Sequence, residues 1–202
     1  MKKIVLGLLT TLSVIAYSCS DNASNKQAAA QSPTPAAQKD TTEVKVVKAS
    51  FTNVDAGVAS YIKKLTDSYL QIKNALIGGK ANEAGDAAKN LAAAMKGFDK
   101  SLLTADQKKI YDQNEEDLKE HAEHIAKSTG DLEHQREHFS MMSEDMYSLV
   151  KAFGGGKTMY HDHCPMAKNG KGAMWLSETK EIKNPYLGEK MMECGDVEEE
   201  IQ

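Results

Sequence analysis

Two parts of this sequence concentrate side chains that can ligate metal ions. His134 and His138 are four residues apart, which places them on one face of a helix. Further along, the segment Cys164–Met166 combines a thiol with a thioether, and Met191 and Cys194 add one more of each. Imidazole binds copper and zinc alike, whereas thiolates and thioethers favour soft ions such as Cu(I). This mixture predicts a copper site, most simply for Cu(I), with Ag(I) as a related ion and zinc as an alternative. Further candidate ligands are His121, His124, His161 and His163.

Other interpretations of the same residues compete with a metal site. Histidines on a glutamate-rich helix are often solvated surface residues, and methionines are often adaptable core residues, which is how we interpret Met142 and Met146. Cys164 and Cys194 could instead form a structural disulfide if the chain is exported to an oxidising compartment. The sequence leaves this alternative open.

The N-terminus has the pattern of an export signal. Lys2 and Lys3 precede the apolar segment Ile4–Tyr17, which is too short to span a bilayer. The following Ser18-Cys19 resembles the site at which bacterial lipoproteins are lipidated. We therefore expect residues 1–18 to be a signal peptide and Cys19 to carry a lipid. Residues 19–52, rich in Ala, Gln, Ser and Thr, are expected to form a flexible linker to the membrane at the periplasmic face.

Residues 53–202 are expected to form one helical metal-binding domain. Apolar residues recur at steps of three and four, with capping residues and glycines between the periodic segments. This pattern predicts helices at about 56–77, 82–98, 105–128 and 132–153. The expected fold is mainly α: an antiparallel four-helix bundle, on which a short, irregular or β C-terminal tail packs from Lys157 onward.

Charge and motifs argue against two other classes of function. The chain has 25 Lys and Arg against 29 Asp and Glu, a net charge of −4, which does not suit nucleic-acid binding. The run Gly154–Thr158 lacks the first glycine of a phosphate-binding loop, because Lys151 stands at that position. No nucleophile signature surrounds Cys164. We therefore expect no catalytic activity.

Several spaced motifs together resemble a bacterial domain of unknown function. This domain occurs in stand-alone secreted lipoproteins and is also appended to periplasmic adaptor proteins of heavy-metal efflux pumps. The resemblance covers about 61–201 and is carried by the segments Glu133–Phe139, Cys164–Ala167, Gly172–Ser177, Glu181–Tyr186 and Met191–Gly195.

The resemblance implies copper or silver handling in the periplasm. It also implies a heavy-metal efflux adaptor as a partner, with membrane contact through the lipid anchor only. The soft-donor positions it points to are His134, His138, Cys164, Met166, Met191 and Cys194. The competing hypothesis is an envelope interaction module that is stapled by a Cys164–Cys194 disulfide and holds no metal.

Overall fold

The computed structural model describes residues 43–202, which lie in one compact unit. The expected signal peptide, the lipidation site Cys19 and the linker up to residue 42 lie outside the described residues. Within the described part, no helix is both long enough and apolar enough to cross a membrane.

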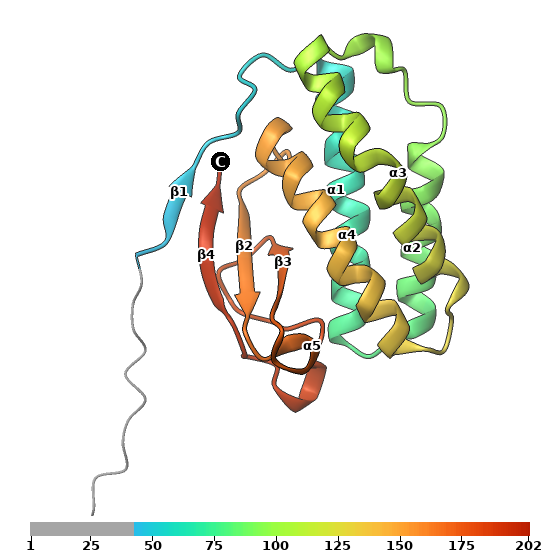
Figure 1. Ribbon diagram of the computed structural model, residues 1–202, viewed down its shortest axis with the longest axis vertical. Coiled ribbons are helices and arrows are strands. Elements are labelled where there is room, and N and C mark those ends of the chain that lie inside the picture. Colours follow the sequence, from blue (N-terminus) through green and yellow to red (C-terminus); the bar gives the residue numbers. More distant parts are fainter. Residues whose placement is uncertain (1–42) are drawn as a thin grey trace, which may run out of the picture. The chain divides into compact units, whose positions relative to one another are not determined.

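Four long helices account for most of the described chain: α1 (Ala56–Ile77), α2 (Ala81–Met95), α3 (Ala105–Lys127) and α4 (Leu132–Phe153). Helix α1 packs on α2 and α4, and α3 packs on α2 and α4. Figure 1 shows the sheet on one side of α1 and α4, with α2 and α3 on the other side. The predicted mainly helical class is confirmed.

Local signals begin the helices where the sequence predicts. Asp55 accepts a hydrogen bond from the backbone N–H of Gly57, and Asp131 accepts one from His134. Thr104 and Gln107 form a complete capping box at the start of α3. Helix α2 ends at Met95, earlier than the predicted Phe98, because the chain becomes extended at Lys96. The apolar residues that recur at steps of three and four along α1 are buried: Val58, Ile62, Leu65, Tyr69, Ile72 and Leu76.

The C-terminal tail contributes three strands of a small mixed sheet, β2 (Met159–Cys164), β3 (Ala173–Ser177) and β4 (Asp196–Ile201). Its order is β1-β4-β2-β3, with β2 antiparallel to both β3 and β4. Between the strands lie the short helix α5 (Ala167–Gly170) and the 3-10 turn η2 (Gly188–Lys190); a second 3-10 turn, η1 (Lys100–Leu102), precedes α3. Helix α4 packs against β3, which joins the sheet to the helices.

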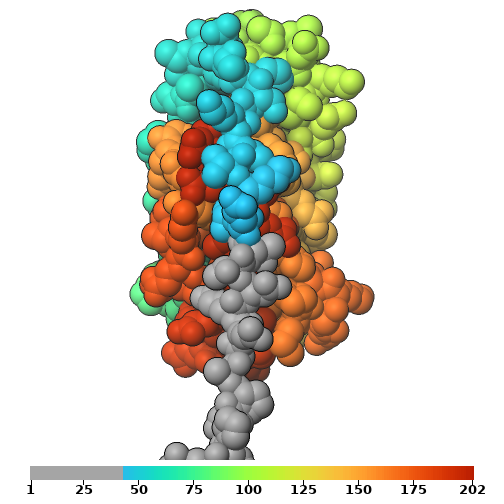
Figure 2. Space-filling model, turned by 90° about the vertical axis from the view of Figure 1, so that its left-hand side faces the viewer, coloured from blue at the N-terminus to red at the C-terminus, as the bar shows by residue number. Residues whose placement is uncertain are grey.

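The fourth strand, β1 (Lys45–Val47), corrects the expected linker boundary at residue 52. It pairs in parallel with β4, and the backbone N–H groups of Ser50 and Phe51 then donate to carbonyls near the end of α4. Figure 2 shows this segment lying across the C-terminal strands. The strand was not predicted because it is only three residues long and its side chains are mostly exposed, so backbone hydrogen bonds to β4 rather than a buried side-chain face hold it in place.

Candidate metal centre

Four histidines gather where the end of α3 meets the start of α4. His124, His134 and His138 each offer a ring nitrogen, and these three atoms lie within 4.8 Å of one another. The ring of His138 lies 4.3 Å from that of His124 and 4.7 Å from that of His134, centroid to centroid. His121 joins through its Nδ1, 3.2 Å from Nδ1 of His138. We call these four residues the histidine cluster.

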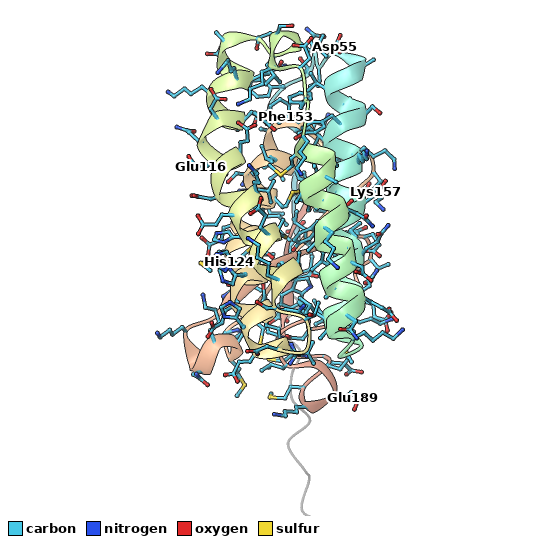
Figure 3. All side chains as sticks on the ribbon, turned by 90° about the vertical axis from the view of Figure 1, so that its right-hand side faces the viewer. Asp55, Glu116, His124, Phe153, Lys157 and Glu189 are labelled. Atoms are coloured by element: carbon cyan, nitrogen blue, oxygen red, sulfur yellow. The ribbon has the colours of Figure 1, made fainter. Side chains whose placement is uncertain are left out.

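The connection between α3 and α4 brings the cluster together. Helix α3 ends at Lys127 and α4 begins at Leu132, so only a four-residue turn separates them. Gly130 adopts a φ of 95° in this turn, a conformation that favours glycine. Because side chains three or four residues apart share a helix face, each helix then presents two of its histidines to the other. Figure 3 shows the labelled His124 beside these two helices.

The surroundings keep the central imidazole neutral. Burial, followed by the nearby His124, His134 and His121, lowers the pKa of His138 to about 4. Burial also lowers the pKa of His121. Metal ions bind the neutral imidazole, so at neutral pH His138 needs to lose no proton before ligation. Glu120 and Glu137 lie 3.7 Å from ring nitrogens of His124 and His134, respectively, and add negative charge beside the cluster.

The arrangement suits a metal with nitrogen ligands after a small contraction. Metal–nitrogen bonds of about 2.0–2.1 Å place the ligand atoms of a tetrahedral site about 3.4 Å apart. The side chains of His124 and His134 are 44% and 41% exposed, so they can rotate inward and an ion can reach them from solvent. Three imidazoles leave a further position for water or another donor.

The two cysteines of the tail form a second donor group. Cys164 ends β2 and is buried, while Cys194 is partly exposed; both are free thiols. The Cys164 thiol and the backbone at Met166 lie close enough to Cys194 to act on the pKa of its thiol. Burial and the Cys164 thiol raise the pKa of Cys194 to about 11. Cys194 is therefore protonated at neutral pH unless a metal displaces its proton.

Backbone contacts hold Cys194 in this position. Asn184 donates from Nδ2 to the carbonyl of Cys194 at 2.7 Å. The next residue, Gly195, has a φ of 141°, and a Cβ there would lie 2.8 Å from the ring of Trp175. Only glycine allows so close an approach to the buried indole. The chain can therefore cross Trp175 and still bring Cys194 to Cys164.

Some methionines are buried and others are exposed, and those predicted to lie in the core are buried. Met142 and Met146 are fully buried in α4. In contrast, Met166 and Met191 are 55% and 40% exposed, which is unusual for such apolar side chains. Met166 directly precedes α5, and Met191 lines a shallow hollow with Cys194. Their thioethers are accessible beside the thiol pair.

The structure separates the predicted ligands into two groups. Within residues 43–202, no hydrogen bond, ion pair or ring contact joins the histidine cluster to Cys164 or Cys194. The segment after Met166 does reach α4, because Lys168 donates to Oγ of Ser140 at 3.3 Å. A cavity of about 410 Å³ lies between this segment and α4, lined in part by Glu133 and Glu137. The predicted ligands therefore form two separate groups, and none of them lines this cavity.

His161 and His163 belong to neither group. They lie on β2, where both face the carboxylate of Glu198 on β4. The sequence analysis did not single out Glu198, because it sits in a run of three glutamates that resembles a solvated surface. Pairing of β4 with β2 is what brings Glu198 to the histidines.

Comparison with known families gives one match. Residues 65–158 match the family described as "Protein of unknown function (DUF3347)". The matched segment covers most of α1 and all of α2, α3 and α4, including the histidine cluster. The match ends before Cys164 and the sheet. No curated protein and no solved structure matches the chain.

Proposed function

We propose that this protein binds copper as Cu(I), or Ag(I), at the periplasmic face of a membrane to which Cys19 anchors it. It either buffers the ion or passes it to a heavy-metal efflux adaptor. The observation that carries the metal-binding proposal is the histidine cluster, with three ring nitrogens from two helices within 4.8 Å. An antiparallel four-helix bundle is the scaffold we propose for it.

The thiol pair supports the choice of a soft ion. Two neighbouring thiols and two exposed thioethers form a donor set that favours Cu(I) and Ag(I) over zinc. We propose that His134 and His138 form the rigid half of the site. Cys164, Met166, Met191 and Cys194 are the tail donors that close over the ion.

The test is an anaerobic Cu(I) titration of the reduced, purified protein against a competing chelator, with Zn²⁺ run in parallel. Two double variants each remove one donor group: His134→Gln/His138→Gln removes the two imidazoles, and Cys164→Ser/Cys194→Ser removes the two thiols. Tight one-to-one Cu(I) binding that both variants weaken at least about tenfold supports a shared site. Loss in only one variant assigns the ion to that donor group alone. If Zn²⁺ binds tightly and Cu(I) binds weakly, the site is a zinc site.

The alternative function is an envelope interaction module without metal. Its support is the contact between the thiols of Cys164 and Cys194, since an oxidising compartment can convert such a pair to a disulfide. Counting free thiols in freshly isolated protein, before and after reduction, separates the two. If the native protein shows these two thiols joined and neither Cu(I) nor Zn²⁺ binds after reduction, the copper proposal is wrong.

A further inference from the structure

A third group of ligating side chains lies on the sheet, apart from the copper donors described above. Nδ1 of His161 is 3.4 Å from Oε2 of Glu198, and Nδ1 of His163 is 3.5 Å from Oε1 of the same carboxylate. Each imidazole therefore lies beside a different carboxylate oxygen of Glu198. The side chains of His161, His163 and Glu198 are 12%, 37% and 50% exposed, so the group opens to solvent on one side.

Sheet geometry explains why these three side chains meet. His161 and His163 are two residues apart on β2 and therefore lie on the same face. The pairing of β2 with β4 shifts register between His161 and Asp162: His161 stands opposite Glu199, and Asp162 opposite Val197. Glu198 is consequently the extra residue of a β-bulge. Bulges redirect side chains, and here Glu198 turns toward the histidines.

The neighbouring Glu199 differs from Glu198 in its partners. Glu199 is buried and bonded by Tyr147, Lys151 and Lys45. This contact pairs the charge of Lys151, a cation that acts on His161, with a carboxylate. Glu198 contacts the two imidazoles and, among the described residues, no lysine or arginine. Its negative charge is therefore available to a bound cation.

One ring nitrogen of His161 lacks a hydrogen-bond partner. Its Nδ1 is buried and makes no hydrogen bond, because its contact with Glu198 is not aligned for one. Buried polar atoms without a partner are rare in folded proteins, because each one loses its hydrogen bonds to water. The ring packs on Tyr147 at 4.5 Å between centroids, which limits its rotation toward another partner. A ligand between His161 and Glu198 would satisfy this nitrogen.

The distances fit a metal ion better than a hydrogen bond. Hydrogen bonds from ring nitrogens to oxygen are about 2.7–3.2 Å long. In a tetrahedral site with bonds of about 2.0–2.1 Å, neighbouring ligand atoms are about 3.4 Å apart. The two observed N···O distances, 3.4 and 3.5 Å, are close to this edge length, although they run to different oxygens of Glu198. Unlike His124, His134 and His138, the three residues do not offer one ligand atom each within 4.8 Å of one another, so binding requires the side chains to move together. His163 and Glu198 are exposed enough to make this movement.

We propose that His161, His163 and Glu198 form a separate site for a divalent cation of the Zn²⁺ or Cu²⁺ class. Two imidazoles and a carboxylate suit such borderline ions and do not suit Cu(I) or Ag(I), which the thiols favour. Solvent supplies the remaining coordination position. An ion here would link β2 to β4 across the bulge and so stabilise the sheet. This site goes beyond the proposed copper function and does not depend on it.

The test isolates the sheet site in a background without the other donors. In purified protein carrying His124→Gln, His134→Gln, His138→Gln, Cys164→Ser and Cys194→Ser, Zn²⁺ is titrated by calorimetry, and Co²⁺ is followed by its visible absorption. We expect one ion per chain. Adding Glu198→Gln or His163→Gln should weaken binding at least about tenfold, while the matched Glu200→Gln on the same strand should leave it unchanged. Circular dichroism verifies that each variant is folded.

Three results would overturn this proposal: no Zn²⁺ or Co²⁺ bound by the folded background variant, binding unaffected by Glu198→Gln and His163→Gln, or binding weakened equally by Glu200→Gln. If the background variant does not fold, the same substitutions are made in the wild-type chain, where loss of one of the bound Zn²⁺ ions is the expected result. An unchanged Zn²⁺ stoichiometry there would contradict the site. Because the readout is Zn²⁺ and Co²⁺, a failure of Cu(I) binding at the other donors is recognised separately.

Discussion

At the scale of single residues, His138 is the centre of the histidine cluster. Its ring lies close to those of His121, His124 and His134, which come from both helices. These neighbours and burial lower its pKa to about 4, so the group is ready to ligate at neutral pH. His121 lies outside the group of three ring nitrogens and contacts that group through His138. His138 should therefore contribute more to metal binding than His121.

Replacing His138 tests this difference. His138→Gln should weaken copper binding at least about tenfold, because it removes a ligand that the other histidines cannot replace. His121→Gln, a matched change on the facing helix, should cost about threefold or less. Competition against a chelator at pH 7 measures both affinities. Equal losses in the two variants would contradict a central role for His138.

The thiol pair makes a second prediction at this scale. With a pKa of about 11, Cys194 is almost entirely protonated at pH 8 and should react slowly with iodoacetamide in the folded, reduced protein. Cys164→Ser removes a thiol that helps to raise this pKa, so it should speed alkylation of Cys194. Mass spectrometry of timed samples gives the rates. Fast alkylation of Cys194 in the unmodified protein would contradict the raised pKa of its thiol.

At the scale of elements, the seam between α3 and α4 carries acidic groups as well as histidines. Asp145 of α4 is partly buried, and its Oδ2 makes no hydrogen bond. Burial, followed by the charges of Asp117 on α3 and the adjacent Glu144, raises the pKa of Asp145 to about 7. The folded protein therefore holds a proton here that the unfolded chain releases near pH 4.

The proton on Asp145 determines how this residue changes the free energy of unfolding with pH. Between pH 4 and 7 the folded state binds more protons than the unfolded state, so Asp145 lowers the free energy of unfolding as pH rises through that window. Asp145→Asn should flatten this part of the profile. It should also stabilise the metal-free protein at pH 8 by about 0.5–1 kcal/mol, a modest gain because solvent screens this partly exposed group. Urea unfolding with EDTA present measures it, and Asp106→Asn, at the exposed start of α3, is the control.

At the scale of the whole molecule, a segment expected to be linker ties the sheet to the end of α4. Phe51 packs on Phe153 with ring centroids 5.2 Å apart, and β1 pairs with β4. The N-terminal and C-terminal ends of the described chain are thus held together, since Gln202 donates to Val47 and accepts from Ala49. This closure connects the strands that carry the sheet site to the helices.

Truncating Phe51 tests the closure. Phe51→Ala should lower the free energy of unfolding by about 1–3 kcal/mol, less than for a fully buried phenylalanine, because the ring is only partly buried. Val46→Ala in β1 is the control, since Val46 is 57% exposed and should cost little. Chemical denaturation measures both. A Phe51→Ala variant as stable as the wild type would place residues 43–52 back in the linker.

The sequence by itself determined the features that depend on neighbours along the chain. Helical periodicity and the caps at Asp55, Thr104 and Asp131 located the long helices, because a helix forms its hydrogen bonds within one segment. The spacing of His134 and His138 placed them on one face for the same reason. Burial of Met142 and Met146 followed from that periodicity as well.

Only the tertiary structure decided the features that depend on partners distant in sequence. The pairing of β1 with β4, the contact between Cys164 and Cys194, and the bulge that turns Glu198 toward His161 all join segments that no local pattern connects. Strand register and bulge position are set by the pairing itself, since a strand bonds to its neighbour and not to itself. The separation of the predicted ligands into helix, thiol and sheet groups has the same physical origin.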